Sequence, residues 1–247
     1  MTNTKISAII PAAGSGTRYS KVKNKLFEEL QGIPVIIHTL RVVSAVKEID
    51  NIVICASQNI IGELTDLIAQ YQVEKVKKVI LGGETRQQSV FNGLTELGNS
   101  DSGMPDYVLI HDGARPLITP AIIQEAIQLA MDKGAVIVAV PTKDTIKRVI
   151  PETGEIIETV DRRELWNVQT PQVFRYREIM DVHQMFREES MTDDAALMEK
   201  AGYKVFVSMG SYKNIKITTE EDILVAKCFM DRGKGCLSAN VSNNMQN

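Results

Sequence analysis

Residues 6–18 read Ile-Ser-Ala-Ile-Ile-Pro-Ala-Ala-Gly-Ser-Gly-Thr-Arg, an apolar run that passes directly into a glycine-rich loop. The run Ile6–Ile10 predicts a buried first strand, and the small residues after it let backbone N–H groups approach a bound group closely. In a parallel α/β sheet such a loop lies at the carboxyl end of the strand, where ligands bind. This stretch therefore predicts an α/β fold with an anion-binding loop after its first strand.

The chain continues with the same alternation of strand and helix. Further apolar runs rich in β-branched residues predict strands at Asn51–Ala56, Lys77–Leu81, Tyr107–His111 and Ala135–Val140. Helical patterns lie between them, at Pro34–Val46, Ile60–Gln70, Arg86–Leu97 and Pro120–Asp132. The strand runs are continuous rather than alternating, which is typical of strands covered on both faces. This order predicts a doubly wound, mostly parallel, Rossmann-like sheet.

The pattern changes at Pro141. Two short strands, Thr145–Ile150 and Glu155–Val160, are joined by Pro-Glu-Thr-Gly, which predicts a β-hairpin. It has few large apolar residues, so we expect residues 141–164 to project as an arm from a single domain spanning residues 1–232. The remaining predicted elements are helices at Tyr176–Glu188 and Asp193–Ala201, strands at Lys204–Ser208 and Asn214–Ile217, and a last helix to Arg232 opened by a Thr218-x-x-Glu221 capping box. The polar tail, residues 233–247, is expected to be disordered.

Composition excludes several classes of protein. The formal net charge of the 247 residues is −3, so nothing attracts the whole chain to nucleic acid or to anionic membranes. No apolar run approaches the roughly 20 residues of a membrane-spanning helix, and Ile6–Ile10 is too short for a signal-peptide core. The three cysteines have no metal-ligand spacing. We therefore expect a cytoplasmic protein with reduced thiols.

Several interpretations of the glycine-rich loop compete. A dinucleotide-binding fingerprint needs a glycine where Tyr19 stands and an acidic residue where the second strand ends at Ala56. A Walker loop needs Gly-Lys-Ser/Thr, which does not occur here. A plain strand-to-helix turn remains open, but Arg18 and Lys25 place two cations on the loop with no acidic residue between them. Cations beside exposed N–H groups favour a polyphosphate site.

Further motifs follow the loop along nearly the whole chain. They are Gly82-Gly-Glu-Thr-Arg-Gln-Gln-Ser89, His111-Asp-Gly-Ala-Arg-Pro116, Asp144-Thr-Ile-Lys147, Thr159-Val-Asp-Arg162, Gln169-Thr-Pro-Gln172, Thr192-Asp193 and Asn214-Ile-Lys-Ile-Thr218. Their order and spacing resemble the 2-C-methyl-D-erythritol 4-phosphate cytidylyltransferase family, among the sugar-nucleotide pyrophosphorylase-like nucleotidyltransferases. One departure is Leu26, where many members have glutamine.

The resemblance implies a reaction of non-mevalonate isoprenoid precursor synthesis. CTP and 2-C-methyl-D-erythritol 4-phosphate would give 4-diphosphocytidyl-2-C-methyl-D-erythritol and pyrophosphate, by in-line attack of the acceptor phosphate on the α-phosphate of CTP. It further implies Mg²⁺ or another divalent cation, held mostly by the phosphates of CTP. It also implies a homodimer in which the arm 141–164 completes the site of the partner subunit.

The resemblance also assigns roles to individual residues. The residues implied in catalysis are Arg18, Lys25, Arg162 and Lys216. Those implied in nucleotide binding are Ala12, Ala13, Gly14, Ser15, Gly16, Gly83, Glu84, Arg86, Ser89, Asp112 and Gly113. Those implied in acceptor binding are Asp112, Arg115, Thr145, Arg162, Thr170 and Lys216. Asp112 is the one residue expected to contact the metal, and His111 is expected to be a packed polar residue without a role in catalysis.

Two other functions stay open from the sequence. The nearer one is a cytidylyltransferase for ribitol or ribulose 5-phosphate, which would share the glycine-rich loop and the Thr-Pro-Gln segment. The other is a non-catalytic nucleotide-binding domain, which would keep the glycines and could lose the cations. All four expected catalytic cations are present, which argues against the second.

Overall fold

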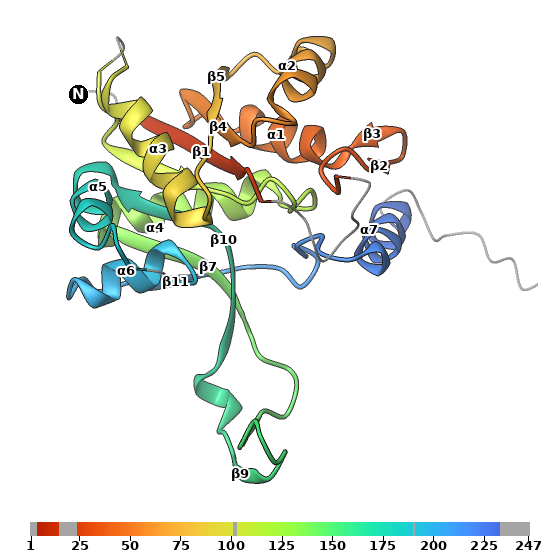
Figure 1. The fold of residues 1–247 in the computed structure, drawn as a ribbon, viewed down its shortest axis with the longest axis vertical. Coiled ribbons are helices and arrows are strands. Elements are labelled where there is room, and N and C mark those ends of the chain that lie inside the picture. The colour runs from red at the N-terminus through yellow and green to blue at the C-terminus, as the bar shows by residue number, and fades with distance from the viewer. Residues whose placement is uncertain (1–3, 15–23, 101–102, 190, 233–247) are drawn as a thin grey trace, which may run out of the picture.

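The computed structural model describes residues 4–14, 24–100, 103–189 and 191–232, and its centre is a seven-stranded sheet (Figure 1). The strand order is β11-β7-β10-β6-β1-β4-β5. The strands are β1 (Ile6–Ala12), β4 (Asn51–Ala56), β5 (Val76–Leu81), β6 (Tyr107–Ile110), β7 (Ala135–Pro141), β10 (Trp166–Arg175) and β11 (Phe206–Met209). Only β10 runs antiparallel to its neighbours among these described strands. The predicted doubly wound, mostly parallel α/β sheet is confirmed.

Helices cover both faces of this sheet. They are α1 (Val35–Ala45), α2 (Ile61–Gln70), α3 (Arg86–Gly98), α4 (Pro120–Lys133), α5 (Tyr176–Met185), α6 (Asp194–Lys200) and α7 (Glu220–Arg232). Neighbouring residues of β1 point into different cores: Ile10 packs in the core that α1, α2, α4 and α7 build, and Ile9 packs in the core of α3, α5 and α6. Both are fully buried, so the continuous apolar pattern of β1 reflects burial on both faces.

The C-terminal region corrects two sequence predictions. The predicted strand Asn214–Ile217 is wrong, because this segment is irregular and docks through single contacts such as the Ile217 N–H donating to the Ala114 carbonyl at 2.8 Å. The predicted Thr218-x-x-Glu221 capping box is also wrong. The carboxylate of Asp222 accepts from the backbone N–H groups of Thr218 and Thr219, and α7 begins at Glu220.

Strand β10 was missed from the sequence. Its residues are Trp-Asn-Val-Gln-Thr-Pro-Gln-Val-Phe-Arg, and proline normally argues against a central strand because it cannot donate to the ladder. The structure accommodates Pro171 where the pairing with β7 shifts register between Val168 and Gln172. Polar side chains at this irregularity thereby reach the interior of the molecule, where Gln169, Thr170 and Gln172 are buried.

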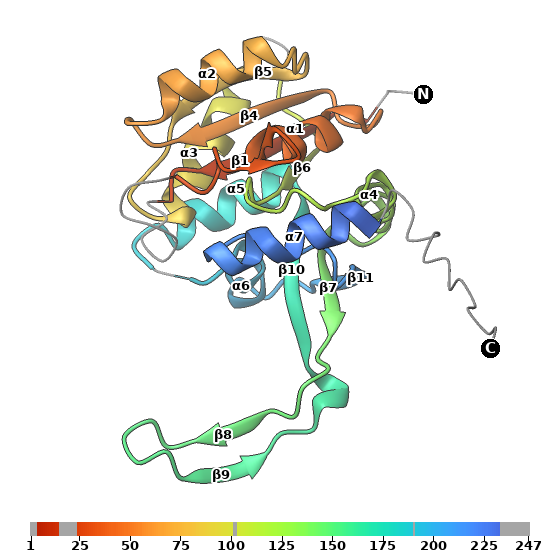
Figure 2. The ribbon, with the colours of Figure 1, turned by 90° about the vertical axis from the view of Figure 1, so that its right-hand side faces the viewer.

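The predicted hairpin is confirmed. Strands β8 (Lys147–Val149) and β9 (Ile156–Thr159) pair antiparallel, and a 3₁₀ turn at Arg162–Glu164 leads back to β10. Figures 1 and 2 show the hairpin projecting clear of the sheet from the ends of β7 and β10. A short hairpin of β2 (Glu29–Leu30) and β3 (Ile33–Pro34) was not predicted.

Two findings complete the fold. Within the ranges that the structure describes, no helix is long and apolar enough to cross a membrane. The predicted tail at residues 233–247 lies outside the described residues, so its expected disorder stays a prediction.

Candidate functional site

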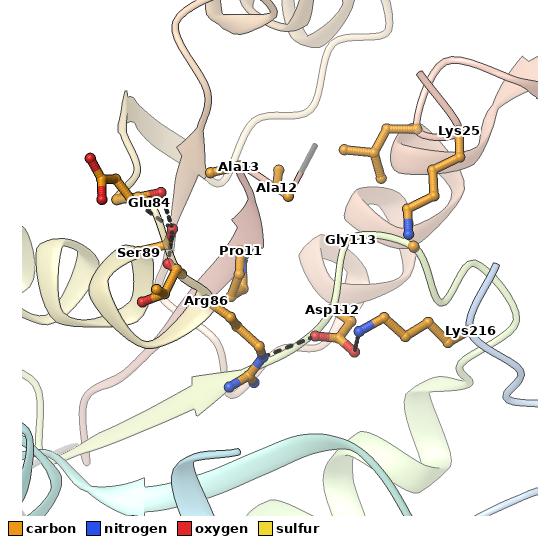
Figure 3. Close-up of a pocket in the computed structure, with 15 residues that line it drawn as sticks. Pro11, Ala12, Ala13, Lys25, Glu84, Arg86, Ser89, Asp112, Gly113 and Lys216 are labelled. Atoms are coloured by element: carbon orange, nitrogen blue, oxygen red, sulfur yellow. Dashed lines mark hydrogen bonds and ion pairs between the residues drawn. The ribbon is translucent and has the colours of Figure 1, made fainter. Parts of the chain in front are cut away.

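A pocket opens at the carboxyl ends of β1, β5 and β6 (Figure 3). Its volume is about 600 Å³, including the part open to solvent. The chain crosses from β1 to β4 and β5 on one side and places β6 on the other, so the pocket lies at a topological switch point, the usual ligand site of such sheets. The lining residues are Pro11, Ala12, Ala13, Gly14, Lys25, Leu26, Gly83, Glu84, Thr85, Arg86, Ser89, Asp112, Gly113, Ala114 and Lys216.

One wall is the turn between β5 and α3. Thr85 caps α3 and accepts a hydrogen bond from the Gln88 N–H, while Ser89 accepts from the Gly83 N–H at 3.0 Å. The turn lies close against the end of β1: a Cβ added to Gly82 would be 2.5 Å from the Cβ of Ala13. A side chain at position 82 would therefore push the two walls of the pocket apart. The turn therefore both caps α3 and forms part of the pocket wall.

Asp112 is the centre of charge in the pocket. Its carboxylate lies 2.9 Å from Lys216 Nζ, 3.4 Å from Arg86 Nε and 3.6 Å from Arg115 Nε. Figure 3 shows Lys216 and Arg86 reaching it from opposite sides. Burial alone would raise the pKa of Asp112, but these three cations hold it well below the usual range. The carboxylate therefore stays ionised, and two of these cations, Arg86 and Lys216, line the pocket where an anionic ligand would bind.

Behind Asp112, His111 positions the loop. Burial lowers the pKa of His111 from 6.5 to about 4, so the ring is neutral at neutral pH. The Asp112 N–H donates to Thr170 Oγ1 at 3.0 Å, and Thr170 Oγ1 lies 3.0 Å from His111 Nδ1. His111 Nε2 faces the carbonyl of Arg115 at 3.4 Å. A hydrogen on Nε2 satisfies all of these contacts, which agrees with the expectation that His111 takes no part in catalysis.

Lys216 comes from a distant, irregular segment that is tied to the same loop. Arg115 Nη1 donates to the Asn214 carbonyl at 2.7 Å, and Asn214 Nδ2 donates to the Thr170 carbonyl at 3.0 Å. Asn214 is fully buried. Arg115 and Thr170 thus lie behind the pocket, where they hold Lys216 in reach of Asp112.

The structure brings most of the predicted residues together. Those that line the pocket are Ala12, Ala13, Gly14, Lys25, Gly83, Glu84, Arg86, Ser89, Asp112, Gly113 and Lys216. Ser15, Gly16 and Arg18 lie outside the described residues. Thr145 and Arg162 lie on the arm and do not line the described pocket of their own chain; Arg162 donates to the Lys143 carbonyl at 2.6 Å.

Sequence reasoning missed two groups of residues. Leu26, which departs from the family pattern, is buried and forms part of the pocket wall. Asp194 and His183 form a buried hydrogen bond with each other, and Asp194 also forms an ion pair with Arg86. Nothing in the local sequence indicates this pair, because the partners come from α3, α5 and α6.

Asp112 predicts a pH-dependent stability. The pKa of Asp112 is lower in the folded than in the unfolded chain, so its ionised carboxylate stabilises the fold at pH values above the unfolded pKa of about 3.9. This contribution is lost as the pH falls below that value toward the folded-state pKa. Asp112→Asn should therefore lower the free energy of unfolding by roughly 1–3 kcal/mol at pH 7, and the deficit should shrink as pH falls below about 4. Urea unfolding at several pH values measures this, with exposed Asp66→Asn as the matched control. A deficit that stays constant down to pH 2 would contradict it.

Comparisons with known proteins agree on one family. A family model described as 2-C-methyl-D-erythritol 4-phosphate cytidylyltransferase matches residues 6–232. A protein of that name from Halalkalibacterium halodurans is 47% identical over 226 residues, which cover 91% of this chain and 96% of the relative. One from Alkaliphilus metalliredigens is 43% identical over 242 residues, covering 94% and 95%. The crystal structure of 4-diphosphocytidyl-2C-methyl-D-erythritol synthase from Anaerococcus prevotii is similar with a TM-score of 0.80 and 34% identity, covering 93% of this chain and all of that one.

Proposed function

The chain belongs to the 2-C-methyl-D-erythritol 4-phosphate cytidylyltransferase family, and we propose that the pocket at the end of β1 carries out this family's reaction. The enzyme is a nucleotidyltransferase that converts CTP and 2-C-methyl-D-erythritol 4-phosphate to 4-diphosphocytidyl-2-C-methyl-D-erythritol and pyrophosphate. The observation that carries the assignment to this pocket is the meeting of Lys25, Arg86 and Lys216 at a switch-point pocket. Arg86 and Lys216 contact the carboxylate of Asp112 from opposite sides, and the three cations suit two phosphorylated substrates.

The chemistry is a single in-line displacement. An oxygen of the acceptor phosphate attacks the α-phosphorus of CTP, the bond from that phosphorus to the bridging oxygen of the β-phosphate breaks, and pyrophosphate leaves with the electron pair. The acceptor phosphate is already ionised, so no protein nucleophile or base is required. The protein contributes positioning and stabilisation of negative charge.

The pocket residues divide this work between them. The side chain of Lys25 extends toward Gly113 (Figure 3). We assign Lys25, together with Arg18, to the phosphates of CTP. Lys216 is assigned to the acceptor phosphate. Its ammonium group lies 2.9 Å from the Asp112 carboxylate. When the acceptor binds, this group can contact a phosphate oxygen in the same pocket in place of that carboxylate. Two bound anions repel each other, and cations on both offset that repulsion.

The turn from Gly83 to Ser89 is assigned to the base and ribose. Its backbone is fixed by the Thr85 cap and by Ser89, so its N–H and carbonyl groups are held in position before the nucleotide binds. A rigid wall with fixed donors and acceptors can match the edge of cytosine and exclude a larger purine. We propose that this wall selects CTP.

The donor set fits a divalent cation held mostly by the substrate. In the described part of the chain no group of three or more His, Cys, Asp or Glu side chains could hold a metal. Asp112 supplies an ionised carboxylate to the pocket, which Glu84 also lines, and this suits Mg²⁺, since Mg²⁺ commonly takes one or two carboxylates and otherwise phosphates and waters. When bound, the ion would neutralise charge on the triphosphate oxygens.

We propose that the arm completes the site of a second subunit. Several of its apolar side chains are exposed: Ile156 is 58% and Ile157 57% exposed, and Ile146 and Val149 are exposed as well. Such a patch favours contact with another protein surface. In a homodimer Arg162, with Thr145, would then reach the partner's acceptor phosphate.

We propose that residues 1–232 form one domain from which this arm projects. The cytoplasmic location stays a prediction.

The experiment that tests the proposed function is pyrophosphate release from CTP with each candidate acceptor. Release with 2-C-methyl-D-erythritol 4-phosphate supports it. Release only with ribitol or ribulose 5-phosphate would instead support the ribitol or ribulose 5-phosphate cytidylyltransferase considered above. CTP binding without turnover of any acceptor would indicate a non-catalytic nucleotide-binding domain.

Lys216→Ala should act mainly on the acceptor. We expect kcat/KM for the acceptor to fall roughly 10- to 100-fold, the effect of losing a hydrogen bond to a charged group, with most of the change in the KM of the acceptor. Steady-state kinetics with each substrate varied in turn measure this. Lys213→Ala is the matched control, because Lys213 is exposed in the same segment. An unchanged acceptor KM would remove Lys216 from acceptor binding.

A further inference from the structure

A buried series of charges continues behind the pocket. Arg86 Nε faces Asp112 at 3.4 Å, and on its other side Arg86 Nη1 donates to Asp194 Oδ2 at 2.7 Å. The second oxygen of Asp194 lies 3.0 Å from His183 Nε2. These contacts therefore join five side chains in one line, which runs from the pocket into the core between α3, α5 and α6. In order, they are Lys216, Asp112, Arg86, Asp194 and His183.

The far end of this line is held rigidly. The side chains of Asp194 and His183 are 1% and 0% exposed. Burial alone would raise the pKa of Asp194, but Arg86 and His183 lower it, so the carboxylate is ionised. An ionised carboxylate only accepts, so the hydrogen of His183 is on Nε2. The ring of His183 also stacks on Phe91 of α3, with 6.5 Å between centroids.

Arg86 is the point where this series meets the pocket. Its backbone is at the first turn of α3, directly after the Thr85 cap, and its guanidinium is shared between Asp112 and Asp194. Its remaining nitrogen, Nη2, is buried and has no hydrogen-bond partner among the residues that the structure describes. Two of the three guanidinium nitrogens are thus fixed by carboxylates and one is left over, which is the arrangement of a side chain oriented for a ligand.

We infer that Asp194 and His183 are positioning residues for the nucleotide: they orient the guanidinium of Arg86 and, through it, the carboxylate of Asp112. This inference rests on the proposed function, since it takes the pocket to be the CTP site. Asp194 holds Nη1 from behind, which prevents Arg86 from turning wholly onto Asp112. His183 holds the second oxygen of Asp194 and so fixes the plane of that carboxylate.

The first test is Asp194→Asn, which keeps the shape of the side chain and removes its charge. We expect the Kd and the KM for CTP to rise roughly 10-fold, while the acceptor KM changes little. Asp181→Asn, an exposed carboxylate on α5, is the matched control and should leave both values unchanged. An unchanged or lowered Kd for CTP in a folded Asp194→Asn variant would overturn the inference.

A double-mutant cycle separates positioning from a structural role. If Asp194 acts through Arg86, Asp194→Asn should raise the Kd for CTP in the wild-type background and have no further effect in an Arg86→Ala background. Equal effects in both backgrounds would show that Asp194 serves the fold alone, and would overturn the inference. Calorimetric CTP binding gives these values without turnover, so they do not depend on the acceptor.

Conservative replacement of His183 gives a test that does not alter the buried carboxylate. The amide of His183→Gln can donate to Asp194 from a position similar to Nε2, whereas His183→Leu cannot. We expect the Kd for CTP to be near the wild-type value in His183→Gln and several-fold higher in His183→Leu, in samples with the same near-UV circular dichroism. Equal Kd values in the two variants would overturn the role of His183. Failure of the wild type itself to bind CTP would count against the proposed function instead.

Discussion

Lys25→Ala is expected to lower kcat by roughly 10²–10³-fold, the usual effect of removing one group that stabilises charge in a transition state. Lys25 lines the pocket, and its ammonium group points toward Gly113 beside Asp112 (Figure 3). In the proposed displacement, negative charge grows on the α-phosphate and on the departing pyrophosphate. A cation at this wall of the pocket stabilises the transition state more than it stabilises bound CTP. The loss should therefore appear in kcat more than in the KM for CTP.

Initial rates of pyrophosphate release, with both substrates saturating, measure this effect. Lys47→Ala is the matched control, because Lys47 is an exposed lysine that does not line the pocket. Unfolding curves for both variants establish that the comparison is between folded proteins. Turnover of Lys25→Ala within a few-fold of the wild type would exclude Lys25 from the mechanism.

Mixing two inactive variants, Lys25→Ala and Arg162→Ala, should restore about a quarter of the wild-type activity. The reason is geometric: Lys25 lies in the pocket, whereas Arg162 lies on the arm, which projects away from the sheet (Figure 2). If the arm serves the partner's site, a mixed dimer has one intact site and one site that lacks both residues. With free exchange half of the dimers are mixed, so one site in four is intact.

The mixing experiment contains its own controls. Each variant alone, at the same total concentration, gives the background rate, and differently tagged chains establish that subunits have exchanged. A mixture of Lys25→Ala with Lys216→Ala is the matched negative control, because both residues line the same pocket and no dimer of these chains has an intact site. If exchange is demonstrated and the first mixture stays inactive, Arg162 serves its own subunit and the proposed role of the arm is wrong.

Much of the fold follows from local sequence. The runs at Ile6–Ile10, Asn51–Ala56 and Ala135–Val140 are strands in the structure. A continuous run of apolar and β-branched residues is typical of a strand that is covered on both faces of its sheet. The predicted helix beginning at Pro120 is capped by the preceding Thr119, whose side chain accepts a hydrogen bond from the Ile122 N–H. Such features depend on neighbours within a few residues, and the sequence displays them directly.

The failures have an equally physical cause. Asn214–Ile217 has the composition of a strand, but its backbone bonds to single groups of a neighbouring loop, the Ile217 N–H to the Ala114 carbonyl and the Asn214 carbonyl to the Arg115 side chain, and no ladder forms. β10 has a proline, yet it is a central strand because a register shift absorbs Pro171. In both cases distant partners outweigh local propensity.

By itself the sequence determined strands β1, β4, β5, β6 and β7 with the helices between them, the glycine-rich loop after β1 and the presence of cations that suit a polyphosphate site, since each is encoded by residues close together in the chain. Only the tertiary structure decided how these cations are arranged. It placed Lys216 and Arg86 on opposite sides of Asp112, and it joined Arg86 to the buried Asp194. These contacts link residues from 26 to 108 positions apart, and their strength comes from burial, which no local pattern of residues records.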